Sequence, residues 1–149
     1  MRKETIKYSD FDGTNREEIF YFNLTRAECV ALHLQTTGGL PAVLEKIVKA
    51  NDVGTIYATF EDLLGRSYGV KSDDGRRLMK GKDGELFLAF KETNAYDELM
   101  CKLISIPGYS ADFFSEVIPA EALEELSNTI DKNASAILKE SASTITQVK

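Results

Sequence analysis

The chain has 149 residues, of which 43% are hydrophobic, and its formal net charge is −6. This length and hydrophobic share are typical of a single domain with its own core. The acidic balance argues against nucleic acid as the main partner, because phosphate binding needs a dense basic face. No secretory segment follows Met1 and no apolar stretch is long enough to span a bilayer, so we expect no membrane partner.

Two strand-like segments flank the motif Asp10-Phe11-Asp12-Gly13-Thr14. Residues 3–9 (KETIKYS) alternate polar and apolar side chains, and residues 19–24 (IFYFNL) are aromatic and β-branched. An Asp-Gly pair between two such segments indicates a hairpin, because Gly accepts a positive φ without steric cost. We therefore predict an N-terminal β-hairpin in which Asp10 and Asp12 serve the turn through local hydrogen bonds.

The same motif has a second interpretation, because it resembles the nucleophile motif of haloacid-dehalogenase-type phosphatases. In that chemistry Asp10 would form an aspartyl-phosphate and Asp12 would act as acid and base. Such a nucleophile follows a buried parallel strand, which is a continuous apolar run. The alternation before Asp10 and the lack of a Rossmann-like βαβ series favour the turn, and a small phosphatase stays as an alternative.

Helical periodicity accounts for most of the remaining chain. Thr25 and Glu28 have the spacing of a capping box and predict the start of the first helix. Residues 37–39 (TGG) would end it, and Pro41 would be the first residue of the next helix. Apolar stripes predict further helices at residues 43–48, 56–64, 86–90, 96–104 and 113–117, and one from Pro119 through Leu123, Leu126 and Ile130. Tyr68 would continue the helix at 56–64 by one turn. Asn94 would cap the helix at 96–104, and Ser110 the helix at 113–117.

Between these helices, residues 72–76 (SDDGR) predict an exposed turn with Gly75 at positive φ, and residues 78–79 a short strand or extended loop. The elements define an α+β fold, with an N-terminal β-hairpin followed by a mainly helical domain of about six or seven helices. We predict one globular domain over residues 1–131. Residues 132–149, rich in Ala, Ser, Thr and Lys, would form a frayed or disordered tail.

The sequence shows no catalytic or metal-binding set, and we expect no cofactor. His33 is the only histidine, and without a second histidine or a cysteine pair nearby we expect no zinc site. Cys29 and Cys101 both lie among apolar neighbours, so we expect two buried free thiols. A single disulfide between them is also compatible with the sequence.

Five segments, in order along the first 120 residues, carry a resemblance to a known family. They are residues 7–28 (KYSDFDGTNREEIFYFNLTRAE), 37–40 (TGGL), 60–80 (FEDLLGRSYGVKSDDGRRLMK), 90–99 (FKETNAYDEL) and 113–119 (FFSEVIP). Together they resemble the tail assembly chaperones of long-tailed (siphovirus-type) phages and prophages of Gram-positive bacteria. The resemblance lies in the order of the segments, because no single motif is diagnostic.

The resemblance implies a binding protein that is not an enzyme. Such a chaperone coats and solubilises the tape-measure protein and helps to recruit tail-tube (major tail) subunits. It would act in the host cell cytoplasm and be absent from the mature virion. A homo-oligomer would suit a long helical client, because many copies bind it by avidity. The alternative within phage morphogenesis is a tail completion or connector subunit.

The candidate partner-binding residues are aromatic side chains in excess of what a small core needs. They are Tyr57, Tyr68, Tyr96, Tyr109, Phe113 and Phe114. The alternative is that most of them belong to the core, since apolar residues at helical spacing usually pack inward.

Overall fold

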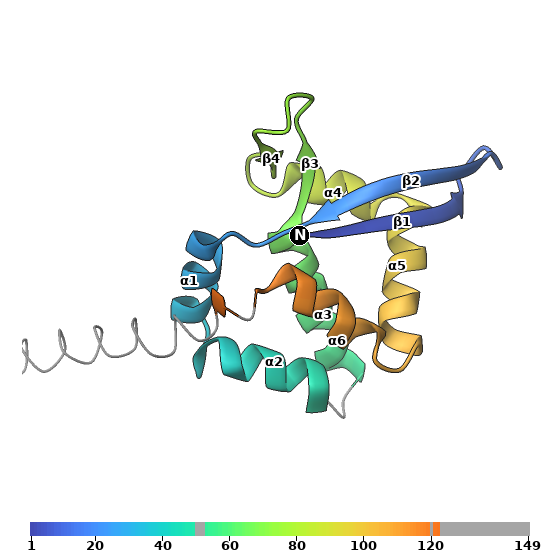
Figure 1. Ribbon diagram of the computed structural model, residues 1–149. Coiled ribbons are helices and arrows are strands. Elements are labelled where there is room, and N and C mark those ends of the chain that lie inside the picture. The colour runs from blue at the N-terminus through green and yellow to red at the C-terminus, as the bar shows by residue number, and fades with distance from the viewer. Residues whose placement is uncertain (50–52, 120, 123–149) are drawn as a thin grey trace, which may run out of the picture.

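The computed structural model describes residues 1–49, 53–119 and 121–122. Within these ranges the chain forms four strands and six helices (Figure 1). They are β1 (Arg2–Ser9), β2 (Asn15–Phe22), α1 (Arg26–Gln35), α2 (Gly39–Lys49), α3 (Val53–Ser67), β3 (Tyr68–Lys71), β4 (Leu78–Met79), α4 (Glu85–Lys91), α5 (Asn94–Ser105) and α6 (Tyr109–Val117). The strands make one antiparallel sheet in the order β1-β2-β3-β4. The predicted α+β class, a hairpin followed by helices, is confirmed.

Two predictions concern segments that the structure does not describe. The predicted helix through Leu123, Leu126 and Ile130 lies outside the described residues. So do the predicted domain end at residue 131 and the predicted tail over residues 132–149.

The predicted hairpin turn is confirmed, and Asp10 organises it. One carboxylate oxygen of Asp10 accepts the backbone N–H groups of Asp12 and Thr14, each at 2.9 Å. The other accepts Arg16 Nε at 2.6 Å, while Gly13 takes a φ of 81°. The ion pair with Arg16 and the backbone bond from Thr14 hold the pKa of Asp10 below its usual range. Asp12 contributes through its backbone N–H.

One face of the sheet builds the aromatic core. Ile6 and Phe22 point inward from β1 and β2 and are fully buried. The Phe22 ring centroid lies 5.7 Å from Tyr68, 6.0 Å from Phe90 and 5.2 Å from Phe113. Tyr68 and Phe90 stack at 4.6 Å. These contacts join the sheet to α4 and α6.

Tyr68 was predicted to continue the third helix, and this prediction is wrong. α3 ends at Ser67, and Tyr68 begins β3, which pairs with the end of β2. The carbonyl of Ser67 accepts the N–H of Asn23 at 2.9 Å, so the chain leaves the helix where it meets β2. On β3, Gly69 leaves room for the Leu78 side chain of β4, because a Cβ at residue 69 would lie 2.5 Å from Leu78 Cγ.

The predicted capping box opens α1. The Thr25 hydroxyl accepts the Glu28 N–H at 3.2 Å, and the Glu28 carboxylate accepts the Thr25 N–H at 3.1 Å. Glu28 also pairs with Lys80 at 2.5 Å. The Lys80 ammonium donates further to the carbonyls of Asn23 and Arg66, each at 2.7 Å. One charge thus fixes the start of α1 against the end of α3.

Two other predicted caps are wrong. Thr93, not Asn94, caps α5 by accepting the Tyr96 N–H. The Asn94 amide instead donates to the carbonyl of Ser9 at 2.9 Å and so holds β1 against α5. At α6 the N-cap is Gly108 instead of Ser110.

The second helix and the cysteines also differ in detail from the prediction. α2 begins at Gly39, so Pro41 lies in its first turn instead of at its first position. Cys29 is buried and free, as predicted, but Cys101 is exposed. Cys101 falls outside the inward stripe of α5, which carries Leu99 and Leu103. The predicted turn at residues 72–76 is confirmed, with Gly75 at a φ of 75°.

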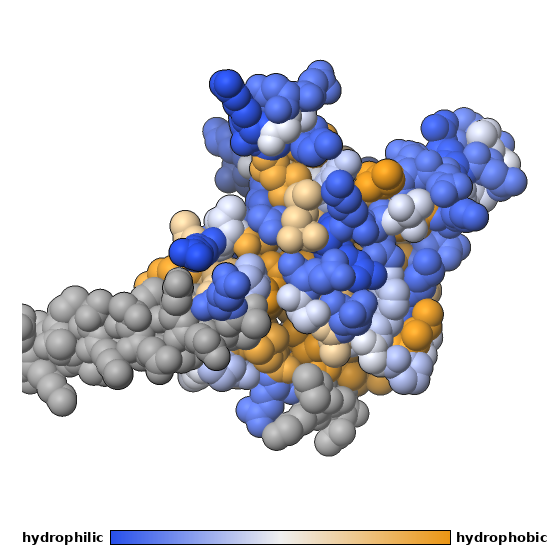
Figure 2. Space-filling view, in the orientation of Figure 1, coloured by the Kyte–Doolittle hydropathy of each residue, from blue (hydrophilic) through white to orange (hydrophobic). Residues whose placement is uncertain are grey.

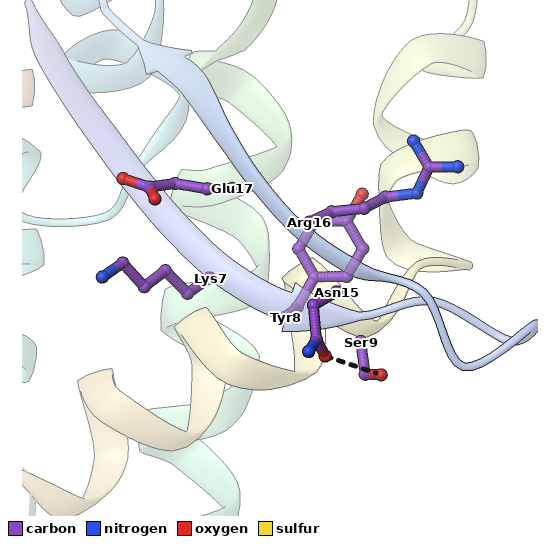
Figure 3. Close-up of a pocket in the computed structure, with 6 residues that line it drawn as sticks. All are labelled: Lys7, Tyr8, Ser9, Asn15, Arg16 and Glu17. Carbon is purple, nitrogen blue, oxygen red and sulfur yellow. Dashed lines mark hydrogen bonds between the residues drawn. The ribbon is translucent and has the colours of Figure 1, made fainter.

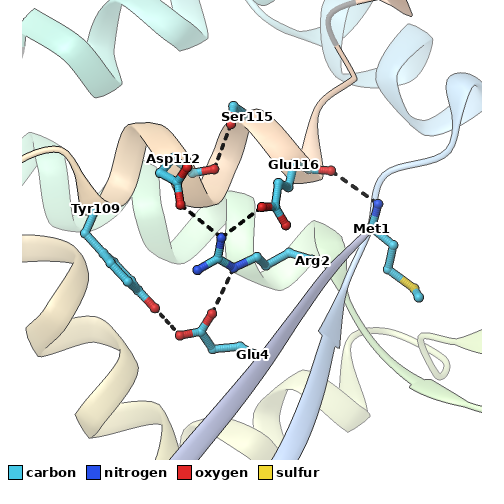
Figure 4. A network of polar contacts seen from close by, with 7 residues as sticks. All are labelled: Met1, Arg2, Glu4, Tyr109, Asp112, Ser115 and Glu116. Atoms are coloured by element: carbon cyan, nitrogen blue, oxygen red, sulfur yellow. Dashed lines mark hydrogen bonds and ion pairs between the residues drawn. The ribbon is translucent and has the colours of Figure 1, made fainter.

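A polar network ties β1 to α6 (Figure 4). The Arg2 guanidinium contacts Glu4 at 2.9 Å and both Asp112 and Glu116 at 3.1 Å. The Tyr109 hydroxyl donates to the other oxygen of Glu4. Burial and this bond raise the pKa of Tyr109 to about 12.

Thr25→Ala should lower the free energy of unfolding by about 1 kcal/mol, the usual size for the loss of an N-cap. Urea denaturation followed by circular dichroism measures the change. Thr37→Ala, at an exposed position after α1, is the matched control and should change little. Equal stability of the Thr25 variant and the wild type would contradict the role of this cap.

Glu28→Gln should make unfolding less dependent on pH. Burial raises the pKa of Glu28, but the bonds from Lys80 and from the Thr25 backbone outweigh it, so the net pKa is lowered. A carboxyl with a lowered folded pKa adds stability above its unfolded pKa of about 4.3, and this stability is lost as the pH falls further. The gap in unfolding free energy between wild type and variant should therefore be present at pH 7 and shrink in acid.

Urea titrations between about pH 3 and pH 7 measure this gap. Glu98→Gln, on the exposed side of α5, controls for the loss of one negative charge. A gap for Glu28→Gln that grows towards acid would contradict the sign of the argument.

Candidate partner-binding groove

The one histidine of the sequence has a structural role in this fold. His33 is buried, and its Nδ1 accepts the N–H of Leu40 at 3.0 Å at the start of α2. In the described part of the chain, no group of three His, Cys, Asp or Glu side chains could hold a metal ion. No helix in the described ranges is long and apolar enough to cross a membrane.

A shallow cavity of about 520 Å³ lies along the hairpin (Figure 3). Its lining comes from both strands, with Ser9 and Asn15 in hydrogen-bond contact at 3.4 Å. Tyr8 donates to Glu18, and Arg16 binds Asp10, so four of its polar side chains are already engaged within the hairpin. This cavity therefore reflects the shape of the hairpin more than a prepared ligand site.

A larger hollow of about 660 Å³ lies between α3 and α4. Its lining has apolar residues and two glycines, which together we call the floor, and charged residues, which we call the rim. The floor contains Tyr57, Ala58, Gly65, Gly84, Phe87 and Leu88, and the rim contains Glu61, Asp62, Arg66, Asp83 and Lys91. We call this hollow the α3–α4 groove.

The floor of the α3–α4 groove packs against aromatic side chains of the core. A Cβ on Gly65 would lie 3.1 Å from the Phe87 ring, so the missing side chain leaves room for that ring. Phe87 packs on Tyr96 at 6.0 Å and on Tyr68 at 6.3 Å between ring centroids. The groove therefore rests directly on the aromatic core.

Two large apolar side chains of the groove are open to solvent. Tyr57 is 39% exposed and Leu88 is 57% exposed. The Tyr57 hydroxyl lies 3.5 Å from the Tyr96 hydroxyl, and this contact holds the outer end of the Tyr57 side chain. Burial and this contact raise the pKa of Tyr96 above its usual range. An exposed aromatic ring with a fixed position suits a contact surface, because little side-chain freedom is lost on binding.

The charges on the rim largely neutralise one another. Lys91 pairs with Glu61 at 2.8 Å across the groove, and Arg66 pairs with Asp62 at 3.1 Å along α3. These pairs leave the apolar floor as the main feature that a partner would contact. A groove between two helices with an apolar floor accepts the apolar face of a third helix.

The six predicted contact aromatics do not form one surface. Tyr57 lines the groove, Tyr96 and Tyr68 lie behind it, and all three surround α4. Phe113 and Phe114 are fully buried beside Phe22 and Phe60, as the core alternative predicts. Tyr109 is half-buried in the polar network of Arg2. Whether any of them binds a partner stays a prediction.

Sequence reasoning missed Gly65 and Leu88. Leu88 lies off the apolar stripe of α4, and such a large apolar residue on the outer side of a short helix was a usable signal. Gly65 inside a helical pattern was a second signal, because an interior glycine often marks a close approach. Their proximity depends on how α3 and α4 pack, and no local pattern shows it.

The described part of the chain is thus an α+β domain with a hollow between α3 and α4 that is lined partly by apolar residues. Comparison with protein families identifies it further. The model of the phage tail assembly chaperone family matches residues 1–148. Because the match spans nearly the whole sequence, the chain belongs to this family, and the predicted resemblance is confirmed at that level. No curated protein and no solved structure matches this chain.

Proposed function

We propose that this chain is a tail assembly chaperone that binds a helical segment of the tape-measure protein in the α3–α4 groove. The family match over residues 1–148 supports the role, and the exposed apolar floor of the groove supports the place. Burying an apolar helix face there would keep the client soluble before the tail tube forms.

One groove of about 660 Å³ holds only a few side chains, so each contact with the client is weak. Repeated contacts along a long helix, made by many copies of the chain, bind far more tightly by avidity. We therefore propose that the chain works as a homo-oligomer. Its net charge of −6 favours solubility when copies are crowded together.

The proposal has two further parts, which follow from the family. The chaperone helps to recruit tail-tube subunits, and it acts in the host cell cytoplasm without entering the mature virion. A tail completion or connector subunit is the competing role. Capture of a tape-measure fragment by the groove separates the two, because a connector has no need of that client.

The proposal includes the absence of enzymatic activity. Asp10 lies in an exposed hairpin turn, where Arg16 and two backbone N–H groups occupy its carboxylate. A nucleophile needs a free oxygen beside the substrate phosphate. The geometry therefore supports a structural role for Asp10.

Leu88→Asp should weaken the binding of tape-measure fragments at least about ten-fold, because it buries a charge in an apolar contact. The fold should persist, since Leu88 is 57% exposed. Leu34→Asp, at a position 61% exposed on α1 and outside the groove, is the matched control. Co-purification and calorimetric titration with overlapping tape-measure fragments measure the effect.

Gly65→Ala gives an independent test, because the new Cβ would lie 3.1 Å from the Phe87 ring and displace that part of the floor, and thermal melts check that the variant is folded. It should weaken binding without adding charge. Full binding by both groove variants would reject the groove as the client site. Failure of the wild type to bind any fragment would reject the chaperone role and favour the connector.

Asp10→Asn should leave client binding unchanged, because the amide oxygen can still accept the backbone N–H groups of Asp12 and Thr14. Neither wild type nor variant should hydrolyse p-nitrophenyl phosphate with magnesium. A magnesium-dependent activity of the wild type that disappears in Asp10→Asn would restore the phosphatase alternative.

A further inference from the structure

The helical body has a second hollow next to the α3–α4 groove. It lies between α3 and the helices α1 and α2, has a volume of about 470 Å³, and we call it the α1–α3 hollow. Its lining includes Leu32 of α1, Val43 of α2 and Leu63 of α3. On the face that Figure 2 shows, hydrophobic residues also reach the surface over the helical body, whereas the outer hairpin and the β3–β4 turn are mainly hydrophilic. The helices therefore offer an apolar partner more than the groove alone.

The two hollows meet along the outer side of α3. Ala58 and Asp62 line both of them. These residues are four positions apart, so they lie one turn apart on the same face of the helix. Both are exposed, whereas Phe60 and Leu64 of the same helix are buried in the core. We call Ala58 and Asp62 the α3 ridge, with the groove on one flank of it and the hollow on the other.

The α3 ridge is low. Ala58 ends in a single methyl group, and the Asp62 carboxylate is turned along the helix to Arg66 Nε at 3.1 Å. Small side chains at a contact let a second helix approach closely, to an interaxial distance of about 8–10 Å. A ridge of this height fits between two helices of a partner without forcing them apart.

A single helix cannot fill both hollows. A helix with its side chains is about 10–12 Å wide, so one that lies along the groove leaves the hollow empty. One that lies across α3 would rest on the α3 ridge and cover neither floor. Two helices, one on each flank, fill both hollows, and each lies about 8–10 Å from α3, near enough to pack on the other. The geometry therefore fits a pair of helices.

The two flanks differ in the side chains that they offer. The groove has the Phe87 ring and the exposed Leu88 side chain. The leucine and valine residues that line the hollow are each at most 5% exposed, and threonines lie among them at residues 55 and 59. The Thr59 hydroxyl donates to the carbonyl of Thr55 at 2.8 Å, so it is satisfied within α3. The groove thus suits large apolar side chains, and the smaller hollow suits shorter ones.

We propose that the chaperone holds its client as a pair of packed helices that straddle α3. One helix lies in the α3–α4 groove and the other in the α1–α3 hollow, with the α3 ridge between them. The inference rests on the client binding proposed for the groove and adds the form in which the client is bound. A site of this shape selects a client for the pairing of its helices as well as for an apolar stripe.

The test compares single and paired forms of a tape-measure fragment. The single form is the fragment that binds the groove, used at concentrations where it is monomeric. One paired form joins two copies in parallel by a thioether link at their C-termini, and the other joins them antiparallel by a glycine-rich loop. Calorimetric titration measures affinity and stoichiometry. One of the paired forms should bind at least about ten-fold more tightly than the single form, with one chaperone chain per pair, because the second helix is already held beside the first.

Variants of α3 assign the second helix to the hollow. Thr59→Arg fills the hollow and should lower the affinity for the paired form to that for the single form, while binding of the single form stays unchanged. Thr55→Arg, at an exposed position of the same lining, is a second variant with the same expected result. Ala58→Arg, on the ridge that both hollows share, should weaken both forms. Ala111→Arg, exposed on α6, is the matched control, and thermal melts confirm that each variant is folded.

Each outcome decides the question. Tighter binding of a paired form, with one chain per pair and loss of the gain in the hollow variants, supports the inference. Equal affinity for single and paired forms, two chains per pair, or an undiminished gain in both hollow variants would overturn it and leave the groove as a site for one helix. A wild type that binds neither the single nor a paired form would reject the proposed function itself.

Discussion

The packing of Phe22 is the contact on which the rest of the structure depends. Its buried ring touches Tyr68 from β3, Phe90 from α4 and Phe113 from α6, which are far apart in the sequence. Phe22 is also the last residue of β2, where that strand pairs with Tyr68 of β3. Loss of this ring would leave a large cavity and cost about 3–5 kcal/mol, a substantial share of the stability of a domain of this size. β2, β3, α4 and α6 thus meet at one side chain.

The segments that carry the family resemblance mostly build this framework. In the 67–75 segment (SYGVKSDDG), Ser67 ends α3, Tyr68 enters the aromatic core, and Gly69 permits the approach of Leu78. In the 90–96 segment (FKETNAY), Asn94 holds β1 through the carbonyl of Ser9. Because these residues hold the fold together, a resemblance at their positions identifies the fold. It does not by itself show which surface binds a partner. The α3–α4 groove is joined to this framework, because Phe87 in its floor packs against Tyr68.

Local patterns predicted local structure well. The hairpin turn at Gly13 and the capping box of Thr25 and Glu28 need only residues close in the sequence, and both were predicted correctly. Tyr68 was misplaced because it stands four residues after Leu64 and so continues a helical period, although pairing with β2 decides its conformation. The groove could not be predicted, because Gly65 and Leu88 come together only through the packing of α3 and α4. Two signals were present in the sequence, an outward leucine and an interior glycine, but neither one shows what lies opposite.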